Sequence, residues 1–144
     1  MVSAENAKLI QEYLDIAEHA SENLERFSKL LSDDCVWYIT PPGLSIRGKE
    51  QVRSFSGMAM GSRSHSSKAK VEIRRWFAEG NHFCLEYNHR ALISVFHIPV
   101  EETVCLVCHI REGKIDSVHE YVDTSHSLLI GLGLQLLPVI LKMR

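Results

Sequence analysis

The sequence lacks a basic excess, a low-complexity segment and a recognisable metal motif. Its 144 residues carry a net charge of −2, with only 8 glycines and 4 prolines. A dedicated nucleic-acid-binding domain usually shows an excess of lysine and arginine, so no nucleic-acid partner is expected. With 45% hydrophobic and 24% charged residues, the composition excludes a disordered or fibrous chain and favours one globular domain.

Signals for targeting and for cofactors are also missing. Residues 1–5 contain neither a basic nor an apolar segment, so no secretory signal peptide is predicted. The eight histidines show no HxH or HExxH spacing, and the glycines at 131 and 133 lack the strand–turn–helix setting of a phosphate-binding loop. We therefore expect no metal and no cofactor.

Cysteine is scarce, with four residues in the chain. Cys105 and Cys108 have the CxxC spacing of zinc and redox sites. They lie in an apolar, strand-like run, where residues three apart point to opposite faces, and no second pair completes a site. Like Cys35 and Cys84, they are predicted to be buried free thiols. This favours a reducing, cytoplasmic location.

The most informative stretch runs from Thr103 to Thr124. Apolar residues alternate along its first half, as in a half-buried strand, and Gly113 suits a tight turn into a second strand over residues 115–122. Glu120 lies late in that second strand. It is the first residue we consider for chemistry.

Helical patterns occupy most of the first third of the chain. Ser3 is placed to cap a first helix that carries Tyr13 on its apolar face, and a second helix follows near Phe27. A short strand is predicted over residues 35–40. A third helix, carrying Phe55, follows Gly48, and the small polar residues 61–67 are predicted to form a loop.

Two longer strand patterns follow. Residues 68–77 alternate, with Ile73 and Phe77 assigned to the core side, and residues 82–95 place Tyr87 and His89 on their apolar parity. This order predicts an α+β fold, with helices packed on one face of a curved antiparallel or mixed sheet around an apolar pocket.

The C-terminal segment, residues 126–144, is apolar on all sides from 128 to 141 except at Gln135. Its apolar run is shorter than the ~20 residues that a membrane-spanning helix needs. We expect it to pack on the domain or on a second subunit, because an apolar surface must be buried. Association with a membrane surface and disorder remain alternatives.

Several short motifs, taken together, resemble one superfamily. They are Leu31–Trp37, Arg47–Val52, Ala78–Asn81, Arg111–Ile115 and Glu120–Asp123. Their order and spacing resemble the nuclear transport factor 2-like superfamily, and within it the SnoaL-like and ketosteroid isomerase-related proteins. The resemblance implies a cone-shaped, cystatin-like roll over residues 1–125, which is found in isomerases, cyclases, epoxide hydrolases and non-enzymatic binders alike.

The resemblance also assigns positions. Tyr13 lies near the tyrosine of the steroid isomerases, whereas Ile39 and Leu106 occupy the places of their two aspartates. Steroid isomerisation by that route is therefore not expected. Limonene epoxide hydrolase-like members carry an arginine and two aspartates at positions that align with Tyr87, His89 and Glu120. The residue types differ, but a donor, an imidazole and a carboxylate are present.

We therefore predict a cofactor-independent acid–base enzyme of isomerase, cyclase or hydrolase type, acting on a small hydrophobic molecule. A carboxylate on an apolar pocket wall becomes a base near neutral pH, because loss of water raises its pKa. Glu120 is the predicted base and His89 its partner, and Tyr87 and Tyr13 are hydrogen-bond donors to the substrate. The predicted ligand contacts are Trp37, Ile39, Leu106 and Phe55.

Each assignment has a structural alternative. Glu120 can form a salt bridge with Arg90 or Arg111 at the end of its strand. Core packing alone can account for His89, Trp37 and Tyr13. The whole domain can also bind a small ligand or a protein without turnover. A homodimer through the outer face of the sheet is expected in either case.

Overall fold

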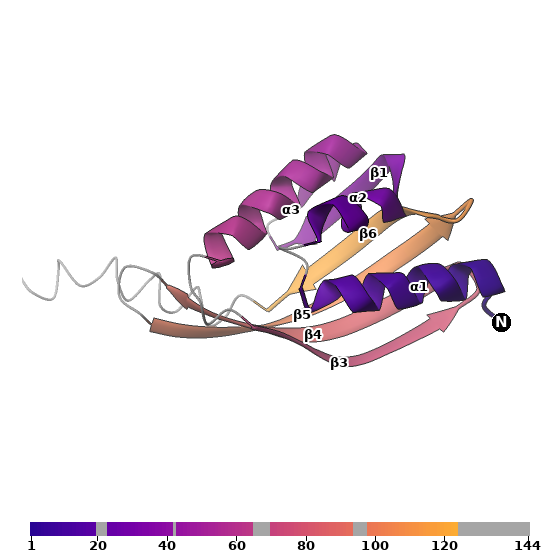
Figure 1. Cartoon of the computed structure of the whole chain (residues 1–144). Coiled ribbons are helices and arrows are strands. Elements are labelled where there is room, and N and C mark those ends of the chain that lie inside the picture. Colours follow the sequence, from indigo (N-terminus) through magenta and orange to yellow (C-terminus); the bar gives the residue numbers. More distant parts are fainter. Residues whose placement is uncertain (20–22, 42, 65–69, 94–97, 124–144) are drawn as a thin grey trace, which may run out of the picture.

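The structure, a computed structural model, describes residues 1–19, 23–41, 43–64, 70–93 and 98–123 (Figure 1). The elements, in chain order, are α1 (Ala4–Ala17), α2 (Leu24–Leu30), β1 (Leu31–Thr40), β2 (Leu44–Arg47), α3 (Lys49–Ser64), β3 (Lys70–Glu79), β4 (His82–Ile93), β5 (Ile98–Arg111) and β6 (Lys114–Val122). The C-terminal segment lies outside the described residues, so its predicted packing is not tested.

The six strands form one mixed sheet in the order β2-β1-β6-β5-β4-β3. Neighbouring strands run antiparallel except β1 and β6, which are parallel. All three helices lie on the same face of this sheet, and β3, β4 and β5 bend along their length (Figure 1). We call the helix-covered side the inner face. The predicted α+β fold is confirmed.

Local signals explain how α1 begins and why it packs on the sheet. The Ser3 hydroxyl oxygen accepts a hydrogen bond from the Asn6 backbone N–H at 3.1 Å, and Glu5 lies in the first turn, where the helix dipole favours a negative charge. Its buried residues are Asn6, Leu9, Ile10, Tyr13 and Ile16, which recur at helical spacing. The predicted cap and first helix are confirmed.

The core fills the space between the helices and the inner face. Phe83 and Leu85 of β4, Leu106 and Cys108 of β5, and Val118 of β6 are each 2% exposed or less. These side chains alternate with more exposed neighbours along each strand, as a half-buried sheet requires.

The β5–β6 turn matches the expectation for a tight hairpin. Glu112 and Gly113 occupy its two central positions with φ values of 51° and 69°. Both positive values fit the mirror-image turns that match the twist of paired strands, and Gly113 adopts them without steric cost.

Several predicted boundaries are wrong. β1 begins at Leu31 rather than at residue 35, because Leu31 continues directly from α2 as a buried strand residue. The short strand β2 was not predicted. Helix α3 extends to Ser64, so the loop predicted from residue 61 is wrong as far as 64. The error arose because small polar residues are typical of loops, whereas here they continue a helix.

Phe77 was assigned to the core side and is instead 65% exposed. The β3–β4 register shifts between Ile73 and Arg75, which reverses the alternation beyond that point. Ala78 consequently packs against the core, opposite Phe83, and Phe77 faces away from it. A bulge of this kind leaves no clear mark in a period-two pattern.

All four cysteines are free thiols, as predicted. Cys35 and Cys108 are buried, whereas Cys84 and Cys105 are partly exposed, so the expected burial holds for two of the four. Burial raises the pKa of Cys35 to about 11. At neutral pH this thiol therefore stays protonated and poorly reactive.

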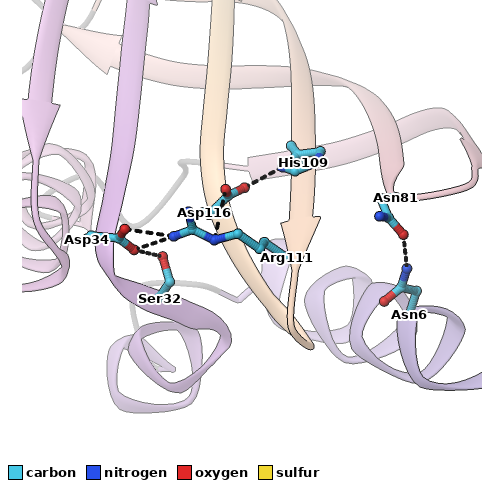
Figure 2. Close-up of polar contacts among 7 residues, drawn as sticks. All are labelled: Asn6, Ser32, Asp34, Asn81, His109, Arg111 and Asp116. Carbon is cyan, nitrogen blue, oxygen red and sulfur yellow. Dashed lines mark hydrogen bonds and ion pairs between the residues drawn. The ribbon is translucent and has the colours of Figure 1, made fainter.

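Polar contacts tie the helices and the hairpin end of the sheet together (Figure 2). Arg111 pairs with Asp34 of β1 and with Asp116 of β6, and Asp116 in turn lies 2.6 Å from the Nδ1 atom of His109. The Asn6 amide donates to the Asn81 side chain at 3.0 Å, joining α1 to the β3–β4 turn. Within the described ranges, no helix is long and apolar enough to cross a membrane.

Candidate functional site

The inner face of β6 carries one carboxylate among apolar neighbours, that of Glu120. In the strand register Glu120 lies between Ile39 of β1 and Leu106 of β5. The indole N–H of Trp37 donates a hydrogen bond to its Oε2 atom at 2.6 Å. A donor this close favours the charged carboxylate and fixes its orientation.

Tyr13 approaches the same region from α1. Its side chain is buried, and its ring packs edge-on against Phe27 at 6.2 Å and Phe83 at 5.4 Å between ring centroids. Burial raises the pKa of Tyr13 well above its usual value, and the charges of Cys108, Tyr87 and Glu120 raise it further. Tyr13 therefore stays a protonated phenol, able to donate a hydrogen bond, throughout the physiological pH range.

The raised pKa of Tyr13 predicts how the free energy of unfolding changes at alkaline pH. The folded protein keeps this proton above pH 10, where the unfolded chain loses it, so stability from this group is complete below pH 10 and falls as pH rises toward the folded pKa. Above pH 10, we expect the free energy of unfolding of the wild type to fall more steeply than that of Tyr13→Phe, with a difference in slope that approaches about 1.4 kcal/mol per pH unit. Urea unfolding between pH 9 and 11 measures the difference, and parallel curves would contradict it.

His89 lies on the inner face of β4 and is only 4% exposed. Its Nδ1 atom is 3.7 Å from the Oε2 atom of Glu102, the residue directly opposite on β5. Its Nε2 atom is buried and has no hydrogen-bond partner among the described residues. Burying such an atom costs folding free energy unless it has a hydrogen-bond partner.

The register separates two residues that were predicted to act together. Leu85, not His89, lies in line with Leu106 and Glu120, and His89 is four residues further along β4. His89 and Glu120 are separated by two strand spacings across the sheet and by four residues along it. In a flat sheet, this separation puts their Cα atoms roughly 16 Å apart. Tyr87 lies on β4 in the row between them.

The residues predicted to contact the ligand differ in their position relative to Glu120. Ile39 and Leu106 flank Glu120. Trp37 is the hydrogen-bond donor to Glu120, which sequence analysis did not assign to it. Phe55 is partly exposed on α3, whereas Val52 of the same helix is fully buried.

The arginines proposed as structural partners of Glu120 have other carboxylates nearby. Arg90 lies 3.3 Å from Glu101, and Arg111 pairs with Asp34 and Asp116. Glu102 was overlooked, although it shares the parity of Val104 and Leu106 and that signal was available in the sequence.

A mixed six-stranded sheet with the N-terminal helices on one face is the arrangement of a nuclear transport factor 2-like fold. The sequence profile of the SnoaL-like domain matches residues 10–118, so the chain belongs to the SnoaL-like domain family. No curated protein sequence matches it.

Solved structures agree on the fold. A hypothetical protein with a ketosteroid isomerase-like fold from Catenulispora acidiphila DSM 44928, in complex with trimethylamine, is 16% identical with a TM-score of 0.67, over 82% of this chain and 87% of that one. A proposed SnoaL-like polyketide cyclase from Jannaschia sp. CCS1 is 10% identical with a TM-score of 0.68, over 86% and 89%. An LEH-like epoxide hydrolase from M. tuberculosis is 22% identical with a TM-score of 0.67, over 94% and 98%.

Proposed function

We propose that this SnoaL-like domain is a cofactor-independent acid–base enzyme that moves a proton on a small hydrophobic carbonyl compound, with Glu120 as the base. One observation carries the proposal: the Glu120 carboxylate is held by the Trp37 indole on an otherwise apolar stretch of the inner face. The fold is shared with a proposed polyketide cyclase and an epoxide hydrolase, which supports an enzymatic role without selecting the reaction.

The proposed step is proton abstraction next to a carbonyl group. Glu120 takes the proton from carbon, the bonding electrons move to the carbonyl oxygen, and the Tyr13 hydroxyl donates a hydrogen bond to the oxygen as it becomes negative. In an unsaturated ketone, returning the proton from Glu120 to the far carbon of the conjugated enolate completes an isomerisation. In a compound with a second carbonyl group, attack of the enolate carbon on that group forms an alkoxide, and transfer of the proton from Glu120 to the alkoxide completes a cyclisation. Both outcomes use the same two residues.

Trp37 is the positioning residue in this proposal. We expect Trp37→Phe to lower the rate of proton abstraction about tenfold, because the indole orients a charged carboxylate. The acid limb of the pH–rate profile should also move to higher pH, since the lost donor favoured the charged form. Exchange of the acetyl hydrogens of an acetylnaphthalene methyl ether with solvent deuterium, followed by NMR, measures both effects. A slower rate with an unmoved profile would reduce Trp37 to a packing role.

The alternative is ligand binding without turnover, and one observation favours it. Trp37 packs edge-on against Phe27 at 5.9 Å and Phe27 against Tyr13, so aromatic side chains of the protein itself occupy part of the inner face. Binding of the same acetylnaphthalene with no deuterium uptake above the buffer rate would select this alternative.

We also propose that the outer face joins two copies of the chain. Tyr121 is 48% exposed there, and Tyr38 stacks on His119 at 4.5 Å, giving an aromatic surface in the middle of the sheet. Sedimentation equilibrium should give twice the mass of the 16.4 kDa chain, and Tyr121→Lys should lower it. A monomer at all concentrations would exclude the dimer.

A further inference from the structure

We propose that His89 and Glu102 form a second polar subsite on the inner face, which binds an O–H or N–H donor of the ligand. Nothing in the family match or in the structural neighbours assigns this pair. The inference rests on the proposed function, because the ligand it describes is the one whose acidic C–H group lies at Glu120.

The first support is a buried nitrogen with unused bonding capacity. His89 is 4% exposed, and its Nε2 atom has no hydrogen-bond partner in the part of the chain that the structure describes. Burying such an atom costs folding free energy unless a partner satisfies it. A ligand group placed at Nε2 supplies that partner.

The second support is the placement of Glu102, which fixes what His89 can bind. Its Oε2 atom lies 3.7 Å from Nδ1 of His89, and the two residues face each other across β4 and β5. A carboxylate on this side favours the tautomer with its proton on Nδ1, which leaves a lone pair on Nε2. The subsite therefore prefers a hydroxyl or amine donor over a carbonyl or ether oxygen.

The position of the pair constrains the ligand's shape. Between this row and the Glu120 row lies a row formed by Tyr87, Val104 and Val122, which are paired across β4, β5 and β6. Val104 is buried, and Tyr87 and Val122 pack against the core. A matching ligand has a carbonyl group at one end, an apolar middle and a donor group at the far end.

A matched pair of probes separates the donor from the rest of the ligand. Hydroxylated acetylnaphthalene, with hydroxyl and acetyl groups at opposite ends of the ring system, offers a donor, and its methyl ether does not. We expect the wild type to bind the hydroxyl compound about tenfold more tightly than the ether, as one buried hydrogen bond supplies. His89→Leu should remove this preference, whereas His82→Leu, on the opposite face of the same strand, should keep it.

Glu102 needs a readout that packing alone would not change. In protein with nitrogen-15 labelled histidine, the ring-nitrogen shifts of His89 should report the Nδ1–H tautomer, and the hydroxyl probe alone should move the Nε2 signal. Glu102→Gln should shift the tautomer toward Nε2–H and reduce the preference for the hydroxyl compound. These wild-type shifts test the subsite even if His89→Leu fails to fold.

Equal affinity of the wild type for the two probes, or an Nε2 signal that neither probe moves, would overturn the subsite. Failure of the proposed function looks different. In that case neither probe takes up deuterium, yet the preference for the hydroxyl compound and the Nε2 response persist.

Discussion

Glu120→Gln lowers deuterium exchange of the acetylnaphthalene methyl ether by about 10²- to 10⁴-fold, the range that a lost general base gives. Glutamine keeps the side-chain length and still offers an oxygen to the Trp37 indole, so the packing around β6 is retained. What disappears is the group that accepts the proton. The rate is measured by NMR, with the fold checked by circular dichroism and thermal unfolding.

Glu86→Gln is the matched control for this prediction. Glu86 lies on the outer face of β4 and pairs with Arg75 at 2.7 Å, so its replacement removes the same charge away from the site. Its exchange rate should equal that of the wild type. A folded Glu120→Gln protein that exchanges as fast as Glu86→Gln would mean that Glu120 is structural.

Phe83→Ala destabilises the protein by about 3–5 kcal/mol, the usual range for emptying a buried phenylalanine position. Phe83 is 1% exposed in the middle of β4 and packs against the Tyr13 ring. Its removal leaves a cavity between α1 and the sheet and releases Tyr13, so exchange activity should fall as well. Urea unfolding measures the loss of stability.

Phe77→Ala tests the same residue type on the neighbouring strand. Because Phe77 is 65% exposed beyond the register shift in β3, we expect a change within about 0.5 kcal/mol. Equal losses at Phe77 and Phe83 would contradict the register of β3. They would support the alternation read from the sequence.

The sequence predicts local features of the fold well. Ser3 and Glu5 predict where α1 begins, Gly113 predicts the β5–β6 turn, and alternation places His89 on the apolar parity of its strand. Each of these signals depends on neighbours along the chain. The structures that they predict therefore do not depend on which distant residues come into contact.

Relations between distant residues could not be predicted in the same way. The Trp37 indole and the Glu120 carboxylate are 83 residues apart and meet because β1 and β6 pair in parallel. No periodicity encodes which strands become neighbours or in what register. The register places Glu120 and His89 in different rows of the sheet, and parity cannot predict this, because parity gives the face of a residue but not its row.

The most direct test of the proposed chemistry is a crystal structure with the acetylnaphthalene methyl ether bound. We expect the carbonyl oxygen within hydrogen-bond distance of the Tyr13 hydroxyl, and the acetyl carbon beside the Glu120 carboxylate, about 3–3.5 Å away. A probe bound elsewhere, with the rings of Tyr13, Phe27 and Trp37 still packed together on the inner face, would contradict it. Glu120 would then be part of the core.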